Sequence, residues 1–598
     1  MTASSPISDA RQTLKRSANR DWLRALQNTA AIEKNPREIL GRAFDAAAAR
    51  RADATAVVDE RERVSFAEFC ARANRMSRWA LQENLRKGEV VALAMGNCVD
   101  YAAIWLGLTR VGVVVALANV NLAPPALAHC LRVAKAARVI AAPAFAKSCE
   151  EAVALLEAPI EVSTYGVETD LHARLTQISS QPLRDDEERD VTILDPALYI
   201  YTSGTTGLPK AAVVTHRRLM HWAHWFAGLA DMGPGDRMFN CLPMYHSVGG
   251  VVAVFAPLLA GGSVVLRARF SASNFWADVV AERCTMFQYI GELCRYLLQA
   301  SEDGATPRHA LRIAIGNGLR GDVWEPFQTR FAIPRILEFY AATESNFSLY
   351  NVEGEPGAIG RIPPFLGQSA QIFLVAHDEE TGLPKRDGAG RCIPCKADEA
   401  GEAMARIETN DGGRGAFEGY VGAAENEKKI LRDVLEQGDA FMRSGDLMRK
   451  DTRGFFYFVD RIGDSFRWKG ENVSTLEVAE VLLRAPGVLD ANVYGVDVPG
   501  HEGRAGMAAL VVGEDFELER LRLHLEQSLP AYARPLFLRI GRTLAVTETF
   551  KHKKKDLVDA GFDPARTADS LYFAPAGATY LALDAEIFDR ICAREIRL

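Results

Sequence analysis

The amino-acid sequence predicts an α/β fold with a large N-terminal domain and a smaller α+β C-terminal domain. The chain has 598 residues, which is room for several folding units. Its content of 48% hydrophobic and 25% charged residues is typical of a globular protein with a sizeable core. Short β-branched runs alternate with helical patterns, an order typical of mostly parallel sheets that helices cover on both faces.

The alternation begins near residue 87. Residues 87–95 predict a strand, residues 100–110 a helix and residues 111–117 a second strand. Later apolar runs predict further strands at 138–141, 197–201, 211–214, 263–266, 286–289 and 312–315. No internal repeat of fixed period is present in the sequence.

The pattern changes after about residue 365, where shorter strands with turn signals predict a β-rich subdomain. A third unit starts near residues 461–464. It is expected to hold helices at 475–483 and 519–529 and strands at 491–496, 507–512 and 536–540. The predicted organisation is an N-terminal extension (1–45), a large domain (46–461, with the β-rich part at about 365–460) and a small mobile domain (462–598).

Charge and cysteine content narrow the function classes. Seventy Lys and Arg against 77 Asp and Glu give a net charge of −7, which does not supply the basic footprint that nucleic acid needs. The ten cysteines are scattered, as expected of reduced thiols in a cytoplasmic enzyme. Cys392 and Cys395 form a C-x-x-C without a second pair nearby, so a plain loop is favoured over a zinc or redox site.

Neither end of the chain nor its apolar runs predict a membrane span. The N-terminus has no apolar signal core. Uncharged stretches at 111–131 and 238–266 are broken by Asn, Pro and Gly, and we interpret them as buried elements. Peripheral contact at the inner face of a membrane stays open, because the Arg-rich N-terminal region suits an anionic surface.

The most informative stretch follows the predicted strand 197–201. It offers glycines, hydroxyls and a lysine, which suit close approach to phosphate oxygens. The spacing before Lys210 and the proline at 209 do not fit a Walker loop. The residues of this candidate phosphate loop are Thr202, Ser203, Gly204, Thr205, Thr206, Gly207 and Lys210.

This loop resembles the signature of the adenylate-forming superfamily, which includes acyl-CoA synthetases, luciferases and adenylation domains of peptide synthetases. Further motifs of that superfamily follow in order along the chain. The resemblance implies an adenine pocket at Gly316, Asn317, Gly318, Leu319 and Tyr340, phosphate contact by Thr343, Mg²⁺ ligation by Glu344, ribose contact by Asp446 and Arg461, and a catalytic lysine at Lys551.

Each of these residues has an ordinary alternative when it is considered alone. Asp446 could be a turn residue, Glu344 a surface charge, and Lys551 part of a solvated basic run with Lys553, Lys554 and Lys555. Their order along the chain favours the functional interpretation. It also suits the chemistry, since activating a carboxylate on ATP brings two anions together and needs cations and N–H donors to offset the charge.

Segments such as YIGELCRYLL (289–298) and DRIGDSFRWKGENVST (460–475) resemble one branch, the fatty acid transport protein and very long-chain acyl-CoA synthetase family. This resemblance implies a ligase that uses ATP, Mg²⁺ and CoA to convert a long-chain or very long-chain fatty acid to its thioester. A coupling to fatty acid uptake is compatible with this activity, because an enzyme that traps the acid as its thioester satisfies both descriptions. The sequence does not specify the acyl chain length or the oligomeric state.

Three positions concern movement and the acyl site. In the superfamily the small domain swings between two orientations, and Gly463 stands at the hinge, where glycine's conformational freedom suits a swing. Gly470 matches the glycine beside the pantetheine arm, with a simple turn as the alternative. His246 resembles a residue bordering the acyl tunnel, and a core histidine is an equal alternative.

Three other functions are alternatives to the synthetase. A lipid uptake or binding protein of the same fold would not need Glu344 or Lys551, yet both are present. A ligase that loads a carrier protein is disfavoured, because no carrier-like serine motif is found. A ligase for a sterol or bile-type carboxylate stays an alternative, because only the acyl tunnel would differ.

Overall fold

The structure is a computed structural model. It describes residues 6–166, 169–203, 208–300, 308–367, 372–378, 381–408, 416–469, 471–501, 503–547, 552–574 and 579–596. The chain divides into two compact units, residues 1–361 with 407–430 and residues 362–406 with 431–598.

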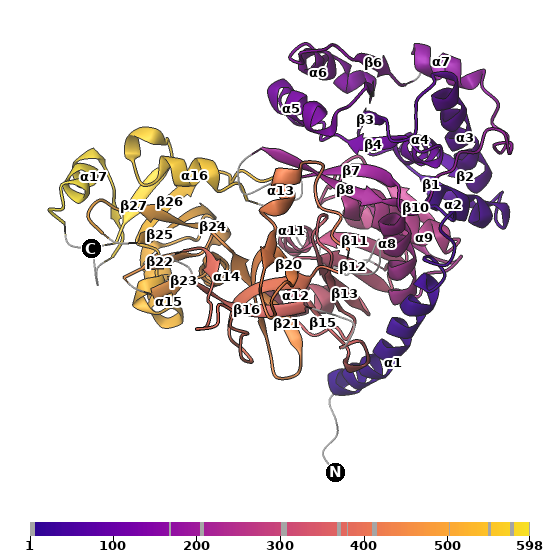
Figure 1. The fold of residues 1–598 in the computed structure, drawn as a ribbon. Coiled ribbons are helices and arrows are strands. Elements are labelled where there is room, and N and C mark those ends of the chain that lie inside the picture. The colour runs from indigo at the N-terminus through magenta and orange to yellow at the C-terminus, as the bar shows by residue number, and fades with distance from the viewer. Residues whose placement is uncertain are drawn as a thin grey trace. The chain divides into compact units, whose positions relative to one another are not determined.

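The first sheet of unit 1 is buried on both faces (Figure 1). Successive side chains of β3 alternate, so that Val91 and Leu93 pack with α3 and α4 while Val90 and Ala92 pack with α5 and α6. The sheet runs in the order β6 (Glu161–Thr164), β5 (Arg138–Ala141), β3 (Val90–Ala94), β4 (Val114–Leu117), β7 (Pro196–Ser203) and β8 (Pro209–Thr215), all parallel except β8. Its helices are α3 (Phe66–Gln82), α4 (Val99–Arg110), α5 (Pro124–Ala134), α6 (Pro143–Val153) and α7 (Asp170–Thr176).

The second sheet of unit 1 also separates two helical layers. Phe339 meets Phe226 of α8 on one face, and Tyr289 belongs to the core under α10, α11 and α12 on the other. The strands lie in the order β15 (Gly360–Arg361), β14 (Ser348–Asn351), β13 (Ile336–Ala341), β12 (Ile313–Asn317), β11 (Met286–Ile290), β9 (Arg237–Asn240), β10 (Ser263–Leu266), β1 (Thr55–Val58) and β2 (Arg63–Ser65). The helices are α2 (Leu40–Ala49), α8 (His216–Leu229), the π-helix Val248–Val252, α9 (Ala253–Leu259), α10 (Phe275–Ala281), α11 (Gly291–Gln299) and α12 (Gly321–Arg330).

The N-terminal helix α1 (Pro6–Thr29) packs along α8. Gly228 of α8 allows this close approach, because a Cβ there would stand 2.5 Å from the Cα of Ala25. Trp22 is 3% exposed, and its ring centroid lies 5.8 Å from those of both Trp225 and Tyr350. The described N-terminal side chains, Trp22 among them, therefore contribute to the core of unit 1.

Unit 2 begins with an antiparallel β-rich part. Its strands lie in the order β17 (Leu383–Pro384), β16 (Ile372–Asp378), β18 (Gly401–Arg406), β20 (Ala440–Lys450) and β21 (Phe455–Arg461), with β19 (Ile430–Arg432) beside β20. The 3-10 helix Pro364–Leu366 precedes these strands, and α13 (Ala423–Glu427) belongs to the part of unit 1 at 407–430. Cys392 is buried in a small core here with Val375, Met404 and Phe441.

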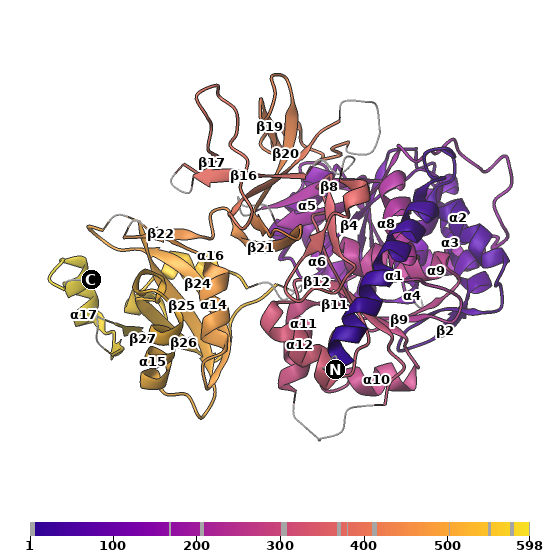
Figure 2. The same ribbon diagram turned by 90° about the horizontal axis from the view of Figure 1, so that it is seen from below.

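The rest of unit 2 is a small α+β fold (Figure 2). Its sheet runs β24 (Val488–Asp497), β25 (Arg504–Val512), β26 (Phe537–Gly541), β27 (Ser570–Phe573) and β28 (Leu581–Ala582). Val478 and Leu482 of α14 and Leu521 and Leu525 of α15 pack in its core. The other elements are the hairpin β22 (Phe466–Trp468) and β23 (Glu471–Val473), and the helices α14 (Thr475–Leu483), α15 (Leu518–Ser528), Ala531–Ala533, α16 (Lys555–Ala560), Pro564–Arg566 and α17 (Ala585–Cys592).

These elements confirm the predicted α/β class. The strands expected at 138–141 and 263–266 and the helix at 475–483 have the bounds that the sequence predicts. The predicted domain boundaries stay a prediction; by contacts, residues 407–430 group with unit 1 although the chain on either side belongs to unit 2. Among the described residues, no helix is both long and apolar enough to cross a membrane.

Candidate active site

The candidate phosphate loop connects two antiparallel neighbours, β7 and β8. Thr202 stands opposite Lys210 in their register, so the strands bring both ends of the loop together. The Nζ of Lys210 lies 2.5 Å from Oε2 of Glu425 and 5.7 Å from the ring centroid of Tyr420. Gly204, Thr205, Thr206 and Gly207 lie outside the described residues, as does the side chain of Ser203.

The residues expected around adenine follow the carboxyl end of β12. A Cβ at Gly316 would stand 2.4 Å from the Tyr289 ring, and Gly318 has a φ of +79°, so both positions require glycine. The backbone N–H groups of Gly318 and Leu319 donate to Oε1 of Glu338 over 2.5 and 3.2 Å. Asn317 lies in register with Ile290 of β11 and Leu319 is buried.

Tyr340 is near the end of β13, the next strand of the same sheet. Its ring stacks on Phe347, with centroids 5.8 Å apart and an interplanar angle of 29°. Because β12 and β13 are parallel neighbours, Tyr340 and the loop Gly316–Gly318 lie at the same edge of the sheet. This is the edge where ligands bind in open α/β sheets.

Thr343 and Glu344 follow β13 and are fixed from α8. Arg218 donates from Nη1 to the Thr343 carbonyl over 2.7 Å and from Nη2 to the Ser345 carbonyl. Burial of Arg218 lowers its pKa, and Glu344 and Glu418 oppose that shift. The Oγ1 of Thr343 is 3.5 Å from Oγ of Ser247. Arg218 lies on α8, whose N-terminus is capped by Thr215. It thus holds the backbone around Glu344, the candidate metal ligand.

Glu344 is 9% exposed and has cationic and phenolic neighbours. The Nζ of Lys429 lies 3.6 Å from its Oε1. The pKa of Tyr420 is raised, first by burial of the phenol and then by the charge of Glu344, whereas the Thr202 hydroxyl opposes the rise. One tyrosine therefore stands beside Lys210, Thr202 and Glu344 and brings these predicted site residues of unit 1 together.

His246 precedes an irregular helical turn. Its carbonyl accepts from the Gly250 N–H over 2.8 Å, and the residues Val248–Val252 form a π-helix. A Cβ at Gly250 would stand 1.9 Å from the Met244 carbonyl oxygen, so the tight turn requires glycine there. The His246 ring is partly exposed and lies 4.6 Å from the Tyr245 ring. Single π turns are frequent at functional sites.

In unit 2, Asp446 of β20 and Arg461 of β21 are register partners. The Nε of Arg461 lies 3.5 Å from Oδ1 of Asp446, whose carboxylate is largely buried. Gly463 follows with a φ of +93°, a backbone conformation that favours glycine. A Cβ placed there would meet no described neighbour within 4 Å, so steric crowding is not the reason for glycine. Gly470 and Lys551 lie outside the described residues.

The lysines near Lys551 differ in their contacts. Lys554 donates to Oδ2 of Asp464 over 3.0 Å and to the Thr475 hydroxyl over 2.8 Å. Asp460 accepts from the Thr475 N–H over 2.7 Å, and burial raises the pKa of Asp460 while Lys554 lowers it. Lys554 is thus joined to the segment around Gly463.

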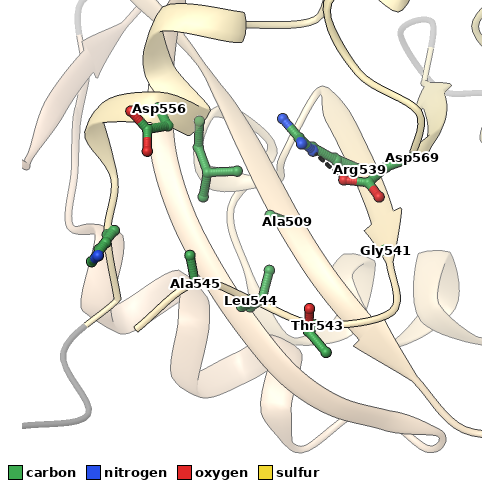
Figure 3. A pocket seen from close by; sticks show the side chains of 10 residues that line it. Ala509, Arg539, Gly541, Thr543, Leu544, Ala545, Asp556 and Asp569 are labelled. Carbon is green, nitrogen blue, oxygen red and sulfur yellow. Dashed lines mark hydrogen bonds and ion pairs between the residues drawn. The ribbon is translucent and has the colours of Figure 1, made fainter. Parts of the chain in front are cut away.

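Lys553 lines a pocket of about 170 Å³ beside the end of β26. Figure 3 shows this pocket. The pocket walls are Leu544, Ala545, Leu557 and the Arg539–Asp569 pair, in which Nε lies 2.6 Å from Oδ2. The figure shows the Arg539 and Asp569 side chains facing one another, so this cation already has a partner.

Comparison with known proteins shows the family. The family described as AMP-binding enzyme matches residues 44–391, and its C-terminal domain matches residues 477–551. The chain belongs to the AMP-binding enzyme family. This AMP-binding enzyme is 39% identical to long-chain fatty acid transport protein 2 of Rattus norvegicus, over 90% of this chain and 88% of the relative. It is 40% identical to long-chain fatty acid transport protein 1 of Homo sapiens, over 92% and 87%.

Solved structures share the fold. An anthranilate CoA ligase in complex with anthranoyl-AMP has a TM-score of 0.74 at 21% identity, covering 87% of this chain and 97% of that one. A fatty acyl CoA synthetase of Mycobacterium tuberculosis has a TM-score of 0.60 at 21% identity, covering 87% and 98%. The predicted family and the predicted enzyme class, an AMP-forming acid–thiol ligase, are confirmed.

Several residues of the site were not predicted from the sequence. Glu338 lies inside the motif EFYAATE, yet nothing in its spacing distinguishes a buried anchor from a surface charge. Arg218 follows the phosphate loop by eight positions without a motif of its own. Tyr420 and Glu425 are distant in sequence from Lys210, and Lys429 is distant from Glu344, so no local motif reveals these contacts.

Proposed function

We propose that this AMP-binding enzyme is a long-chain or very long-chain fatty acyl-CoA synthetase that uses ATP, Mg²⁺ and CoA. The observation that carries the proposal is the grouping of Lys210, Thr202 and Glu344 around Tyr420 in unit 1. It combines a phosphate-binding cation, a hydroxyl donor and a hard oxygen ligand. The fatty acid follows from the curated relatives, which are named long-chain fatty acid transport proteins.

In the first half-reaction, a carboxylate oxygen of the acid attacks the α-phosphorus of ATP, and the bond from that phosphorus to the bridging oxygen breaks. The products are the acyl-adenylate and pyrophosphate. Lys210, Thr343 and the N–H groups of the loop 202–207 are assigned to the phosphate oxygens, where charge accumulates in the transition state. Lys551 is assigned to the oxygens around the reacting phosphorus.

Glu344 is the residue we assign to Mg²⁺. Its carboxylate is largely buried and is held beside a cation, Lys429, which fits a place where positive charge is favourable. Bound there, Mg²⁺ would offset charge on the phosphates. Arg218 donates to the backbone carbonyls of Thr343 and Ser345, so the backbone that carries Glu344 is held on both sides.

The nucleoside is assigned to residues at strand ends. Gly316, Asn317, Gly318, Leu319 and Tyr340 are proposed to surround adenine, since the loop after β12 and the stacked Tyr340 lie at the same edge of the sheet. Asp446 and Arg461 are proposed to bind the ribose hydroxyls, because a carboxylate accepts from two such donors and the arginine lies 3.5 Å from it.

In the second half-reaction, the sulfur of CoA attacks the acyl carbonyl carbon, the bond to the AMP oxygen breaks, and AMP leaves. Gly470 is assigned to the pantetheine path and His246 to the border of the acyl site. Gly463 is assigned to the hinge between the large domain (46–461) and the small one (462–598). We place the enzyme in the cytoplasm, with peripheral contact to a membrane where fatty acid enters.

The test is release of AMP and pyrophosphate from ATP with fatty acids of graded length, with and without CoA, beside a Lys551→Ala variant. We expect turnover that needs acid and CoA and collapses in the variant. Turnover with sterol-type acids alone would replace the fatty acid by the alternative substrate. Pyrophosphate release without a CoA thioester would indicate another acceptor, and silence with every acid would favour a lipid-binding protein.

A further inference from the structure

Residues 416–430, which we call the crossing segment, lie along the outer edge of β8. Val213 donates to the Gly419 carbonyl over 2.9 Å, Val421 donates to the Ala211 carbonyl over 3.0 Å, and Ala212 bridges to Tyr420. The crossing segment therefore runs antiparallel to the strand that carries Lys210. Its place beside the candidate phosphate site is fixed by backbone hydrogen bonds.

The first half of the crossing segment has a stable anchor. Glu418 accepts from the Thr215 hydroxyl over 2.7 Å and lies 3.2 Å from Nη2 of Arg217. The side chains of Arg217 and Glu418 are 9% and 10% exposed. Neither Arg217 nor Thr215 is assigned to substrate. The contacts of Glu418 can therefore stay in place while the rest of the crossing segment changes partners.

The second half contacts the assigned site residues themselves. Glu425 lies 2.5 Å from the Nζ of Lys210, and this contact holds the pKa of Glu425 below its usual range. Lys429 lies 3.6 Å from Glu344. Both pairs retain some exposure, with the four side chains between 12% and 30% exposed.

The signs of these charges match those of the proposed ligands. Next to Lys210, the Glu425 carboxylate occupies the position of an anion where the proposed function puts a phosphate. Next to Glu344, the Lys429 ammonium occupies the position of a cation where it puts Mg²⁺. A lysine ammonium has three donors and a carboxylate has two oxygens, so each group could keep part of its present contact. Full contact of Lys210 or Glu344 with the ligand would still compete with these close pairs.

Resting on that proposed function, we propose that Glu425 and Lys429 are positioning residues that hold Lys210 and Glu344 in place before ATP·Mg binds. On binding, the phosphates replace Glu425 beside Lys210, and the metal replaces Lys429 beside Glu344. Each pair keeps a long side chain ordered before the ligand arrives, and each must separate when the ligand binds. The measured affinity for nucleotide then contains the cost of separating both pairs.

If Glu425 and Lys429 exchange with the ligand, removing their charges should tighten binding. Residues that only stabilise the fold would not have this effect. Removing the Glu425 charge frees Lys210, so ATP should bind more tightly, by about two- to fivefold for a partly exposed pair. Removing the Lys429 charge takes a competing cation away from Glu344. The Mg²⁺ concentration that gives half of the Mg²⁺-dependent gain in ATP affinity should therefore fall by a similar factor. A variant that merely damaged the fold would weaken both kinds of binding.

The experiment measures equilibrium binding of ATP to the full chain by calorimetry, first in a chelator and then over a Mg²⁺ titration. The variants are Glu425→Gln and Lys429→Met. Glu427→Gln is the matched control for the first, because it removes an exposed carboxylate two residues away. Lys428→Met is the control for the Mg²⁺ titration, because the ion pair of Lys428 is with Glu425, over 3.4 Å.

We expect tighter ATP binding in Glu425→Gln and a lower Mg²⁺ requirement in Lys429→Met, with each control within about twofold of the parent. Unchanged or weaker binding in both variants would overturn the exchange. If the parent protein itself does not bind ATP, the proposed function fails, and that result is distinct because it appears before any variant is compared.

Discussion

Tyr289 donates its phenol hydrogen to Oε2 of Glu338 over 2.5 Å, on a face of the second sheet where Glu338 is only 1% exposed. The other carboxyl oxygen accepts from the Gly318 and Leu319 N–H groups. Burial raises the pKa of Glu338 from its ordinary value of 4.5 to about 8, although these three donors oppose the shift. An ionisable group thus holds the loop that we assign to adenine.

The raised pKa of Glu338 predicts a pH dependence of stability. A carboxyl whose folded-state pKa is raised binds its proton more tightly when folded, so its contribution to stability is fully present below about 4.5 and lost as the pH rises through about 8. Glu338→Gln carries no charge at any pH. Its melting temperature should therefore fall less than that of the parent between about pH 6 and about pH 9.

Differential scanning calorimetry across this range checks the prediction, with Glu325→Gln on the exposed side of α12 as the control. Parallel pH profiles of the parent and Glu338→Gln would contradict a raised pKa of Glu338, because they would mean that folding does not change its protonation over this range.

Lys554 should influence the alternation between the half-reactions. It joins Asp464, the neighbour of the assigned hinge Gly463, to Thr475, which in turn holds Asp460. In Lys554→Met the carboxylates of Asp460 and Asp464 lose their shared cation. We expect overall thioester formation to slow about tenfold while pyrophosphate exchange changes less, since hinge changes act on conformational steps.

The control for Lys554 is Lys555→Met at the exposed start of α16. Rate measurements of both half-reactions decide the matter: equal slowing in the two lysine variants would rule out a role specific to Lys554.

Substitution can separate Lys551, the proposed catalytic lysine, from its neighbours. Lys554 is engaged by Asp464 and Thr475, and Lys553 lines the pocket beside Arg539. We therefore expect Lys551→Ala to slow adenylate formation by about a hundredfold or more, as for loss of a charge-stabilising donor. Lys553→Ala should change the rate by less than about threefold. A larger effect of Lys553→Ala than of Lys551→Ala in pyrophosphate exchange would reassign the role.

The packing of α1 on α8 predicts an unusual penalty for adding a methyl group. Alanine is normally preferred to glycine inside a helix. At Gly228, however, a Cβ would meet the backbone of Ala25 at 2.5 Å, so Gly228→Ala should destabilise unit 1 by about 1–3 kcal/mol. Gly233→Ala is the matched control, because nothing lies within 4 Å of its Cβ. Urea unfolding measures both, and equal midpoints for the two variants would contradict close helix packing.

Much of the fold is predictable because its signals are local. The strand at 138–141 and the helix at 475–483 are recognised from their patterns of apolar residues. The loop at 202–210 is recognised from its composition. These features need only neighbouring residues to be interpreted.

The contacts between distant segments could not be predicted in the same way. Glu338 and Tyr289 are 49 positions apart and meet only because β11, β12 and β13 are adjacent. The crossing segment reaches Lys210 from more than two hundred positions away, after the chain has entered unit 2. Such pairs depend on strand order, which hydrophobic periodicity does not encode.

The docking of α1 bears on how the protein can be shortened. The family match begins at residue 44, so a chain cut to that boundary would keep every assigned site residue and lose Trp22 and Ala25. The aromatic side chains of Trp225 and Tyr350 would then face water instead of Trp22. A newly exposed apolar strip of this kind promotes association between copies, so poor yield of such a fragment would report a missing cover and not a missing catalytic group.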